Sequence, residues 1–326
     1  MLPTMPVPPT ASTRKRRRLA GSVGLVASAV LLASCSSSPA PVGRRAPSRS
    51  SHVSNHSRGA SSSRHAGQLE SITLSASGMA IIDAQIGVLD GYLAKAQASL
   101  GSAPGSGSSS SRTSAQSLGV STGMSTTVAE GQLAAQVARR QNEISTMAAA
   151  VTSSTSVTAP DRALLDSELS ADASGLRAVV TKAQAATSAG PLVSLAHSVV
   201  TYYRVLSLTV PKVYMVLAAD QAVFLETALA RITAQAALEA SAPQAVSRLS
   251  TTVRQRAKAD ASAASSRVTA ATTSTEGISA SVLSLIPAGF PGNKVVLQAG
   301  VNDLSSVLHD IGLVRNDIAV LVRLLG

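Results

Sequence analysis

The sequence predicts an all-α protein, an elongated antiparallel helical bundle with coiled-coil-like contacts that follows a disordered N-terminal linker. Three observations predict this fold class. Apolar residues recur at alternating steps of three and four over most of the chain after residue 68, which is the spacing of packed helix faces. Aromatic residues make up only 2% of the chain, whereas β-sheets favour aromatic and β-branched residues. We find no alternating apolar and polar run that would predict a strand.

The first predicted helix spans residues 69–100. Its apolar stripe contains Ile72, Met79, Ile82, Ile86, Leu89, Leu93, Ala96 and Leu100. Gly78, Gly87 and Gly91 each weaken it by about 1 kcal/mol relative to alanine. Residues 101–127 are rich in glycine and serine, and such a low-complexity segment predicts a disordered loop.

Two helices are predicted next, at residues 128–152 and 159–188. The first carries an apolar stripe with an arginine in register: Leu133, Val137, Arg140, Ile144, Met147 and Val151. The start of the second helix is indicated by three residues. Thr158 is a capping residue, Pro160 is an early proline, and Asp161 is an acid in the first turn. A Gly-Pro pair at residues 190–191 ends it.

Residues 192–240 and 243–286 predict the two longest helices, which we expect to form an antiparallel hairpin. The first is the most apolar part of the chain, but four charged residues interrupt it: Lys212, Asp220, Glu226 and Arg231. It is therefore not expected to span a membrane. Pro211 lacks a backbone N–H and is expected to kink this helix.

The last predicted helix, residues 293–325, has the most regular heptad pattern. Its stripe contains Leu297, Leu304, Val307, Ile311, Val314, Ile318, Leu321 and Leu325. A repeat of about 3.5 residues predicts left-handed packing against its neighbours. The predicted helical body thus extends over residues 69–326.

Residues 14–35 have the layout of an export signal. Five basic residues (14–18) precede an apolar run (19–33), and small residues follow. Leu32, Ala33, Ser34 and Cys35 resemble the lipobox of bacterial lipoprotein signal peptides. The resemblance implies that residues 1–34 are removed, from a start at Met1 or Met5, and that Cys35 receives a diacylglyceryl group. Two acyl chains anchor a protein stably, which implies a location at the outer, extracytoplasmic face of the cell membrane. An uncleaved anchor or an ordinary signal peptide is the alternative.

The distribution of charge argues against a nucleic-acid partner. The net charge is +11, but ten of the 28 Lys and Arg residues precede residue 69, and no acid precedes Glu70. From residue 69 onward 18 basic residues stand against 17 acidic ones, so the body is nearly neutral. Residues 35–68 predict a disordered linker. Its arginines either contact anionic lipid headgroups or only solvate the linker: Arg44, Arg45, Arg49, Arg58 and Arg64.

Four of the six aromatic residues lie near Pro211, together with several charged residues. A pocket that is mostly apolar with a few placed polar groups suits small-molecule binding. The candidate pocket residues are Tyr203, Pro211, Tyr214, Asp220 and Phe224. The competing interpretation is a filled core whose largest side chains lie at the middle of the bundle.

Motifs of hydrolases, nucleotide-binding enzymes and zinc proteases are absent: there is no Gly-x-Ser-x-Gly, Gly-x-Gly-x-x-Gly, phosphate loop or His-Glu-x-x-His. We therefore expect no enzyme, no catalytic residues, no metal site and no cofactor. The pattern Tyr203-Arg204-Val205, Leu208, Pro211-Lys212 and Ala218-Ala219-Asp220 resembles uncharacterised helical exported proteins of high-G+C Gram-positive bacteria. That resemblance implies an all-α body and no known activity.

The sequence thus predicts a lipid-anchored cell-envelope protein with a non-catalytic structural or protein-interaction role. It would be held at the membrane through Cys35 and would contact a protein partner of the envelope. The alternative is an extracytoplasmic binding module for an apolar small molecule near the Pro211 kink.

Overall fold

A computed structural model describes residues 69–70, 72–101 and 118–325. Within these ranges the regular structure is helical, which confirms the all-α fold. The α-helices are α2 (Ala76–Gly101), α3 (Thr126–Ser153), α4 (Ala159–Gln184), α5 (Ala189–Ser198), α6 (Val210–Glu239), α7 (Pro243–Arg248), α8 (Thr251–Thr275), α9 (Ile278–Leu283) and α10 (Asn293–Leu325). The predicted signal peptide, Cys35 and the linker lie outside the described residues.

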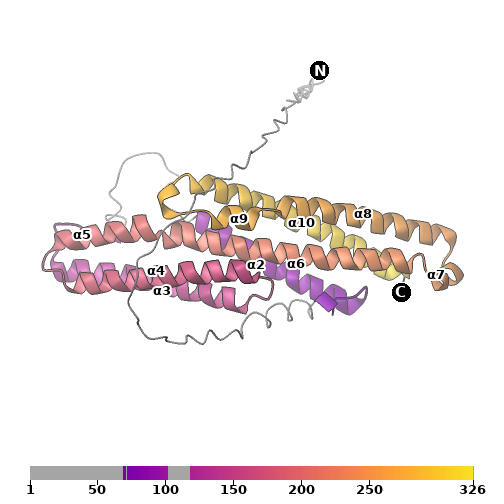
Figure 1. Cartoon of the computed structure of the whole chain (residues 1–326), viewed down its shortest axis with the longest axis horizontal. Coiled ribbons are helices and arrows are strands. Elements are labelled where there is room, and N and C mark those ends of the chain that lie inside the picture. Colours follow the sequence, from indigo (N-terminus) through magenta and orange to yellow (C-terminus); the bar gives the residue numbers. More distant parts are fainter. Residues whose placement is uncertain (1–68, 71, 102–117, 326) are drawn as a thin grey trace, which may run out of the picture. The chain divides into compact units, whose positions relative to one another are not determined.

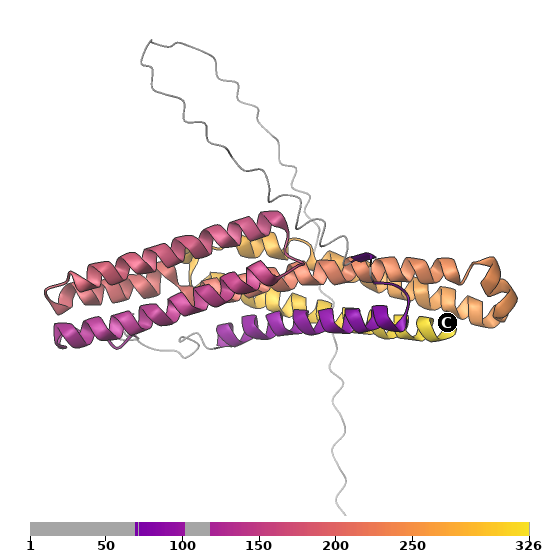
Figure 2. The same cartoon turned by 90° about the horizontal axis from the view of Figure 1, so that it is seen from below.

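Helix α6 is the central element of the body, and α2, α3, α8, α9 and α10 pack on it (Figures 1 and 2). Its residues from Val210 to Ala222 are all buried, on every side of the helix. Helices α2, α8 and α10 pack on α6 and, in the pairs α2–α10 and α8–α10, on each other. Helices α3, α4 and α5 form a second group that contacts the first part of α6 and the segment before it. A helix that is apolar all round is expected in such a central position.

The predicted apolar stripes form the contacts between helices. On α10 the buried residues include seven of the predicted ones: Leu297, Leu304, Val307, Ile311, Val314, Ile318 and Leu321. The buried face of α8 is built mainly from alanine, at Ala257, Ala261, Ala264 and Ala271. Small side chains at these positions let α8 approach α6 and α10 closely. On α10, the position of Gly300 serves the same purpose, since the methyl group of Met215 occupies the space that a side chain there would need.

The break in the predicted helix 192–240 lies at Arg204 and not at Pro211. Two π-helical segments, η2 (Val199–Tyr203) and η3 (Val205–Thr209), flank Arg204, whose φ and ψ of 43° and 29° are left-handed. Pro211 lies in the first turn of α6. A proline is tolerated there, because the first N–H groups of a helix have no partner within that helix.

Several other predicted boundaries differ from the structure. Helix α2 begins at Ala76 and not at residue 69, and α4 ends at Gln184, so the Gly-Pro pair at residues 190–191 lies in the first turn of α5 and does not end the preceding helix. The predicted helix 243–286 is divided into α7, α8 and α9 by an extended Leu249 and by Gly277, whose φ of 80° is left-handed. Part of the predicted loop 101–127 also packs against the body, because Leu118 and Val120 are buried in its core. These two apolar side chains hold residues 118–125 against the body, and α3 begins at Thr126.

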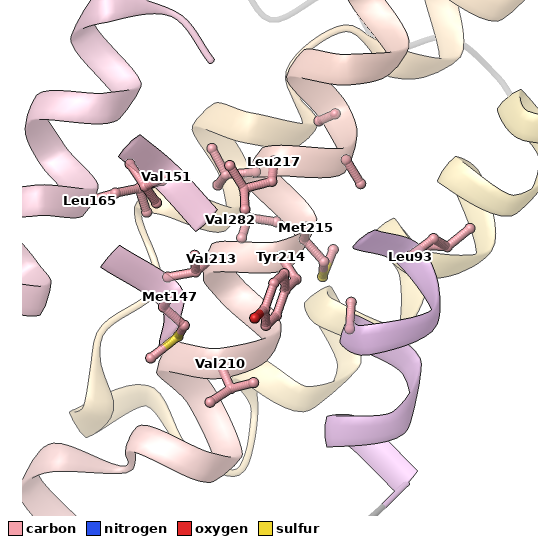
Figure 3. Packing of buried hydrophobic residues seen from close by; sticks show 14 of the residues in the cluster. Leu93, Met147, Val151, Leu165, Val210, Val213, Tyr214, Met215, Leu217 and Val282 are labelled. Atoms are coloured by element: carbon pink, nitrogen blue, oxygen red, sulfur yellow. The ribbon is translucent and has the colours of Figure 1, made fainter. Parts of the chain in front are cut away.

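We predict that shortening a buried side chain of α6 destabilises the body far more than shortening an exposed one. Leu217 is fully buried next to Met215 and Val282 (Figure 3), so Leu217→Ala is expected to lower the free energy of unfolding by about 2–5 kcal/mol. Leu238 on the same helix is 73% exposed, and Leu238→Ala is expected to change it by less than about 0.5 kcal/mol. Urea denaturation followed by circular dichroism measures both. Equal losses at the two positions would contradict this packing.

Candidate functional site

Several polar side chains are buried on α6 inside an otherwise apolar core. Lys212, Asp220 and Glu226 are only 3%, 6% and 2% exposed. Burying an ionisable group costs several kcal/mol unless it is paired or hydrogen-bonded. The partners of these groups therefore show which neighbouring helices fix the position of α6 and which of its ionisable groups have shifted pKa values.

Lys212 is held between two neighbouring elements. Its Nζ lies 2.6 Å from Oε2 of Glu168 on α4 and donates a hydrogen bond of 3.0 Å to the carbonyl oxygen of Leu285. Glu168 remains partly exposed at the edge of the core. The ion pair therefore joins α6 to α4, while the carbonyl contact joins it to the segment after α9.

Asp172 lies one turn further along α4, next to the same ion pair. The hydroxyl of Thr209 donates a hydrogen bond of 3.1 Å to its Oδ2. Burial raises the pKa of Asp172 to about 6, while the Thr209 hydrogen bond and Lys212 oppose this rise and Glu168 adds to it. This group of polar side chains thus includes a carboxyl that titrates near neutral pH.

Asp220 joins α6 to the start of α4 and to α9. Its Oδ2 accepts a hydrogen bond of 3.0 Å from the backbone N–H of Thr158, and its Oδ1 accepts one of 3.1 Å from the hydroxyl of Ser279. Burial raises the pKa of Asp220 to about 7, and the nearby carboxyl of Asp161 raises it further, against those two hydrogen bonds.

The remaining buried polar groups of α6 reach the helices on its other side. The side-chain nitrogen of Gln221 donates a hydrogen bond of 2.8 Å to the side-chain oxygen of Gln85 on α2. Thr275 on α8 donates one of 2.6 Å to Glu226, whose pKa is raised by burial. Each of these side chains is used in a contact between helices.

The five residues of the predicted pocket do not surround a common space. Tyr214 and Phe224 are 4% and 2% exposed and pack in the core, where the ring of Tyr214 stacks on that of Tyr92 with centroids 6.3 Å apart. Tyr203 instead packs against α4 at Gly175, where its ring fills the space that a side chain would need. The aromatic cluster is thus divided between two packing regions.

A cavity of about 440 Å³ lies on the N-terminal side of Pro211, between α3 and the π-helical segments. It contains Val210 but none of the five predicted pocket residues. Its lining includes three arginines, Arg139, Arg140 and Arg204. Arg140 lies in register with the apolar stripe of α3. A charged residue at such a position is the one feature of the sequence that indicates this cavity.

Other functional signals in the described residues are few. They contain no group of three or more His, Cys, Asp and Glu side chains arranged to hold a metal ion. One stretch of the described chain, Ala189–Glu239, is long and apolar enough to span a membrane, and its most apolar 18-residue window has a mean hydropathy of 1.4. Since 83% of its most apolar window is buried inside the body, the core position of α6 accounts for this composition. No protein-family model, curated protein or solved structure matches the chain.

We predict that the two partners of the buried ion pair respond unequally to neutral substitutions. Glu168→Gln leaves the Lys212 ammonium buried without its counter-charge and is expected to cost about 3–5 kcal/mol. Lys212→Met removes the buried charge while keeping a similar volume, and is expected to cost less than about 1.5 kcal/mol. Chemical denaturation of the two variants at pH 7.5 compares them. A larger loss for Lys212→Met would contradict the view that desolvation of Lys212 dominates this pair.

We predict that the body becomes less stable as the pH rises from about 4 to about 7. In the folded state Asp172 and Asp220 keep their protons until the pH approaches their pKa values of about 6 and about 7, whereas in the unfolded state they ionise near pH 3.8. Unfolding then releases protons, so the free energy of unfolding falls as the pH rises. The pKa of Asp83 is lowered by Arg315. Its contribution to the free energy of unfolding therefore rises with pH, but only below about pH 4.

The variant that tests this prediction is Asp220→Asn, since asparagine cannot ionise and its oxygen can still accept from Thr158. It is expected to flatten the dependence of the melting temperature on pH and to raise that temperature above the unsubstituted value at pH 8. Asp303, which is exposed on α10, gives the matched control Asp303→Asn. An unchanged pH profile for Asp220→Asn would contradict the role of Asp220.

Proposed function

We propose that this chain is a bacterial surface lipoprotein, held at the outer face of the cell membrane by a diacylglyceryl group on Cys35. Its helical body then acts outside the membrane in a non-catalytic, structural or protein-interaction role. The lipobox-like residues 32–35 support the anchor, as does the position of Cys35, the only cysteine of the chain, at the end of an apolar run.

The filled centre of α6 is the observation that carries the proposed role of the body. A binding module of the kind predicted near Pro211 would need an open space among Tyr203, Tyr214 and Phe224. Tyr214 and Phe224 are instead buried in a packed core, and the polar groups around them bond to neighbouring helices. Because Lys212 and Asp220 bond to neighbouring helices, they are not free to bind a ligand. This favours a scaffold that contacts its partners through its surface.

We predict that Cys35→Ala releases the protein from the membrane. Intact-mass analysis of the protein from its native membrane is expected to find a chain that begins at a diacylated Cys35. The variant is expected to lack this mass and to leave the membrane fraction, because one thiol carries both acyl chains. Ser36→Ala keeps the thiol and is the matched control. An unmodified chain that begins elsewhere would rule out the lipoprotein proposal.

The same cells test the interaction role. Amine-reactive crosslinking of intact cells is expected to give a discrete higher-mass species with the anchored protein and to lose it with Cys35→Ala, since the lipid concentrates the body at the envelope. An anchored protein that remains entirely monomeric under crosslinking would contradict an interaction role while leaving the anchor intact.

A further inference from the structure

The cavity next to α3 has a charge that the chain does not balance. Arg139 and Arg140 of α3 and Arg204 between the π-helical segments line it, and Glu143 is the one acid in its lining. None of the three arginines forms an ion pair with a carboxylate within the described part of the chain. The lining therefore carries a net charge of about +2 in a body that is nearly neutral overall.

Arg140 is the most buried of the three cations, with only 7% of its surface exposed. Its Nη1 donates to the backbone and side-chain oxygens of Gln136, at 2.9 and 3.2 Å. Both acceptors are uncharged. Burial and the adjacent charge of Arg139 lower the pKa of Arg140, and among the described residues no carboxylate forms an ion pair with it. A bound anion would supply a counter-charge.

Arg204 is placed by an unusual backbone. It is the one non-glycine residue with a positive φ among the described residues, a conformation that costs about 1–3 kcal/mol and is concentrated at ligand sites. Its guanidinium carbon lies 4.2 Å from the centroid of the Phe290 ring, and its Nε is buried without a hydrogen-bond partner. Stacking on the ring uses the face of the guanidinium, so hydrogen bonds to an acceptor are left to its terminal Nη groups.

Besides the charged residues, Ala98 and the polar residues Ser99, Gln136 and Ser207, the rest of the cavity lining is formed by larger apolar side chains. These are Leu118, Val199, Val200, Val205, Leu206 and Val210. The volume of about 440 Å³ lies in the range of about 300–1,000 Å³ that is usual for small-molecule sites. The cavity thus combines a cationic rim with walls that would bury hydrocarbon.

We propose that this cavity binds a small amphiphilic anion, with a carboxylate or phosphate group held by Arg139, Arg140 and Arg204 and a hydrocarbon portion against the valines. Guanidinium groups bind both of these anions through paired hydrogen bonds. A purely polar anion would leave the apolar part of the lining in contact with water, and a neutral hydrocarbon would leave the buried Arg140 without a counter-charge. This site is independent of the lipid anchor and goes beyond the proposed surface role of the body.

Isothermal titration calorimetry of the purified full chain tests this site with four probes below their micelle concentrations. The probes are decanoate, decyl phosphate, decanol and inorganic phosphate. At least one of the two amphiphilic anions is expected to bind at least about tenfold more tightly than both decanol and inorganic phosphate, since a charge-assisted hydrogen bond and a buried chain each contribute at that scale. The preference between decanoate and decyl phosphate identifies the anionic group.

Substitutions then place the binding in the cavity. Arg140→Gln is expected to weaken binding of the preferred anion by about tenfold or more. Because Arg140 is buried, the unfolding temperature of the Arg140→Gln variant is measured in parallel. Arg139→Gln, at an exposed position, is a second variant that does not risk the fold, and it is expected to weaken binding several-fold. Arg256, which is exposed on α8 and outside the cavity, gives the matched control Arg256→Gln.

Four outcomes would overturn the proposal. They are no binding by either amphiphilic anion, binding of the preferred anion no tighter than that of decanol, binding of the preferred anion no tighter than that of inorganic phosphate, and equal loss of affinity in Arg139→Gln and Arg256→Gln. None of them bears on Cys35, since the anchor is tested by mass and fractionation. Failure of the anion site is therefore distinguishable from failure of the proposed surface role.

Discussion

The burial of α6 on all sides between Val210 and Ala222 is the constraint from which the rest of the structure follows. A helix without a solvent face cannot carry ionisable side chains unless its neighbours pair with them. Lys212 and Thr209 find partners on α4, and Asp220 finds them at the start of α4 and on α9. Gln221 pairs with α2 and Glu226 with α8. These contacts allow only one rotation and one axial position of α6 relative to the helices around it, which apolar packing alone would fix less strictly.

The apolar pattern of the sequence was enough to predict the helices whose stripes face a neighbour. Helix α10 has the predicted bounds, and its buried residues follow the predicted heptads. The apolar pattern did not predict helix boundaries that are set by a single residue with a local effect on the backbone. Ser250 caps α8 by accepting a hydrogen bond from Val253, and Gly277 ends the helical geometry before α9, although the apolar spacing runs on through both.

The break at Arg204 could not have been predicted from local sequence. Its neighbours Tyr203 and Val205 are neither glycine nor proline, and arginine has no intrinsic preference for left-handed φ. Tertiary contacts hold this conformation. The ring of Tyr203 packs into space left open at Gly175, Arg204 stacks on Phe290, and Val205 is fully buried. The predicted pocket was accordingly placed at Pro211, which is a strong local signal but here lies in the first turn of α6.

The ionisable groups of α6 and the arginines of the cavity differ in their partners. The first group contributes to the folded structure, whereas the second is explained better by binding. On α6 Lys212 has a counter-charge in Glu168. The carboxyls of Asp220 and Glu226 accept hydrogen bonds from neutral groups, and because burial raises their pKa values they can take up a proton, which an arginine cannot lose. The arginines of the cavity have neutral partners or none, and the backbone that holds Arg204 there is itself strained. Stability alone would not favour such an arrangement, because an apolar residue at position 140 would complete the stripe of α3. The uncompensated charge is instead explained if its partner comes from outside the chain.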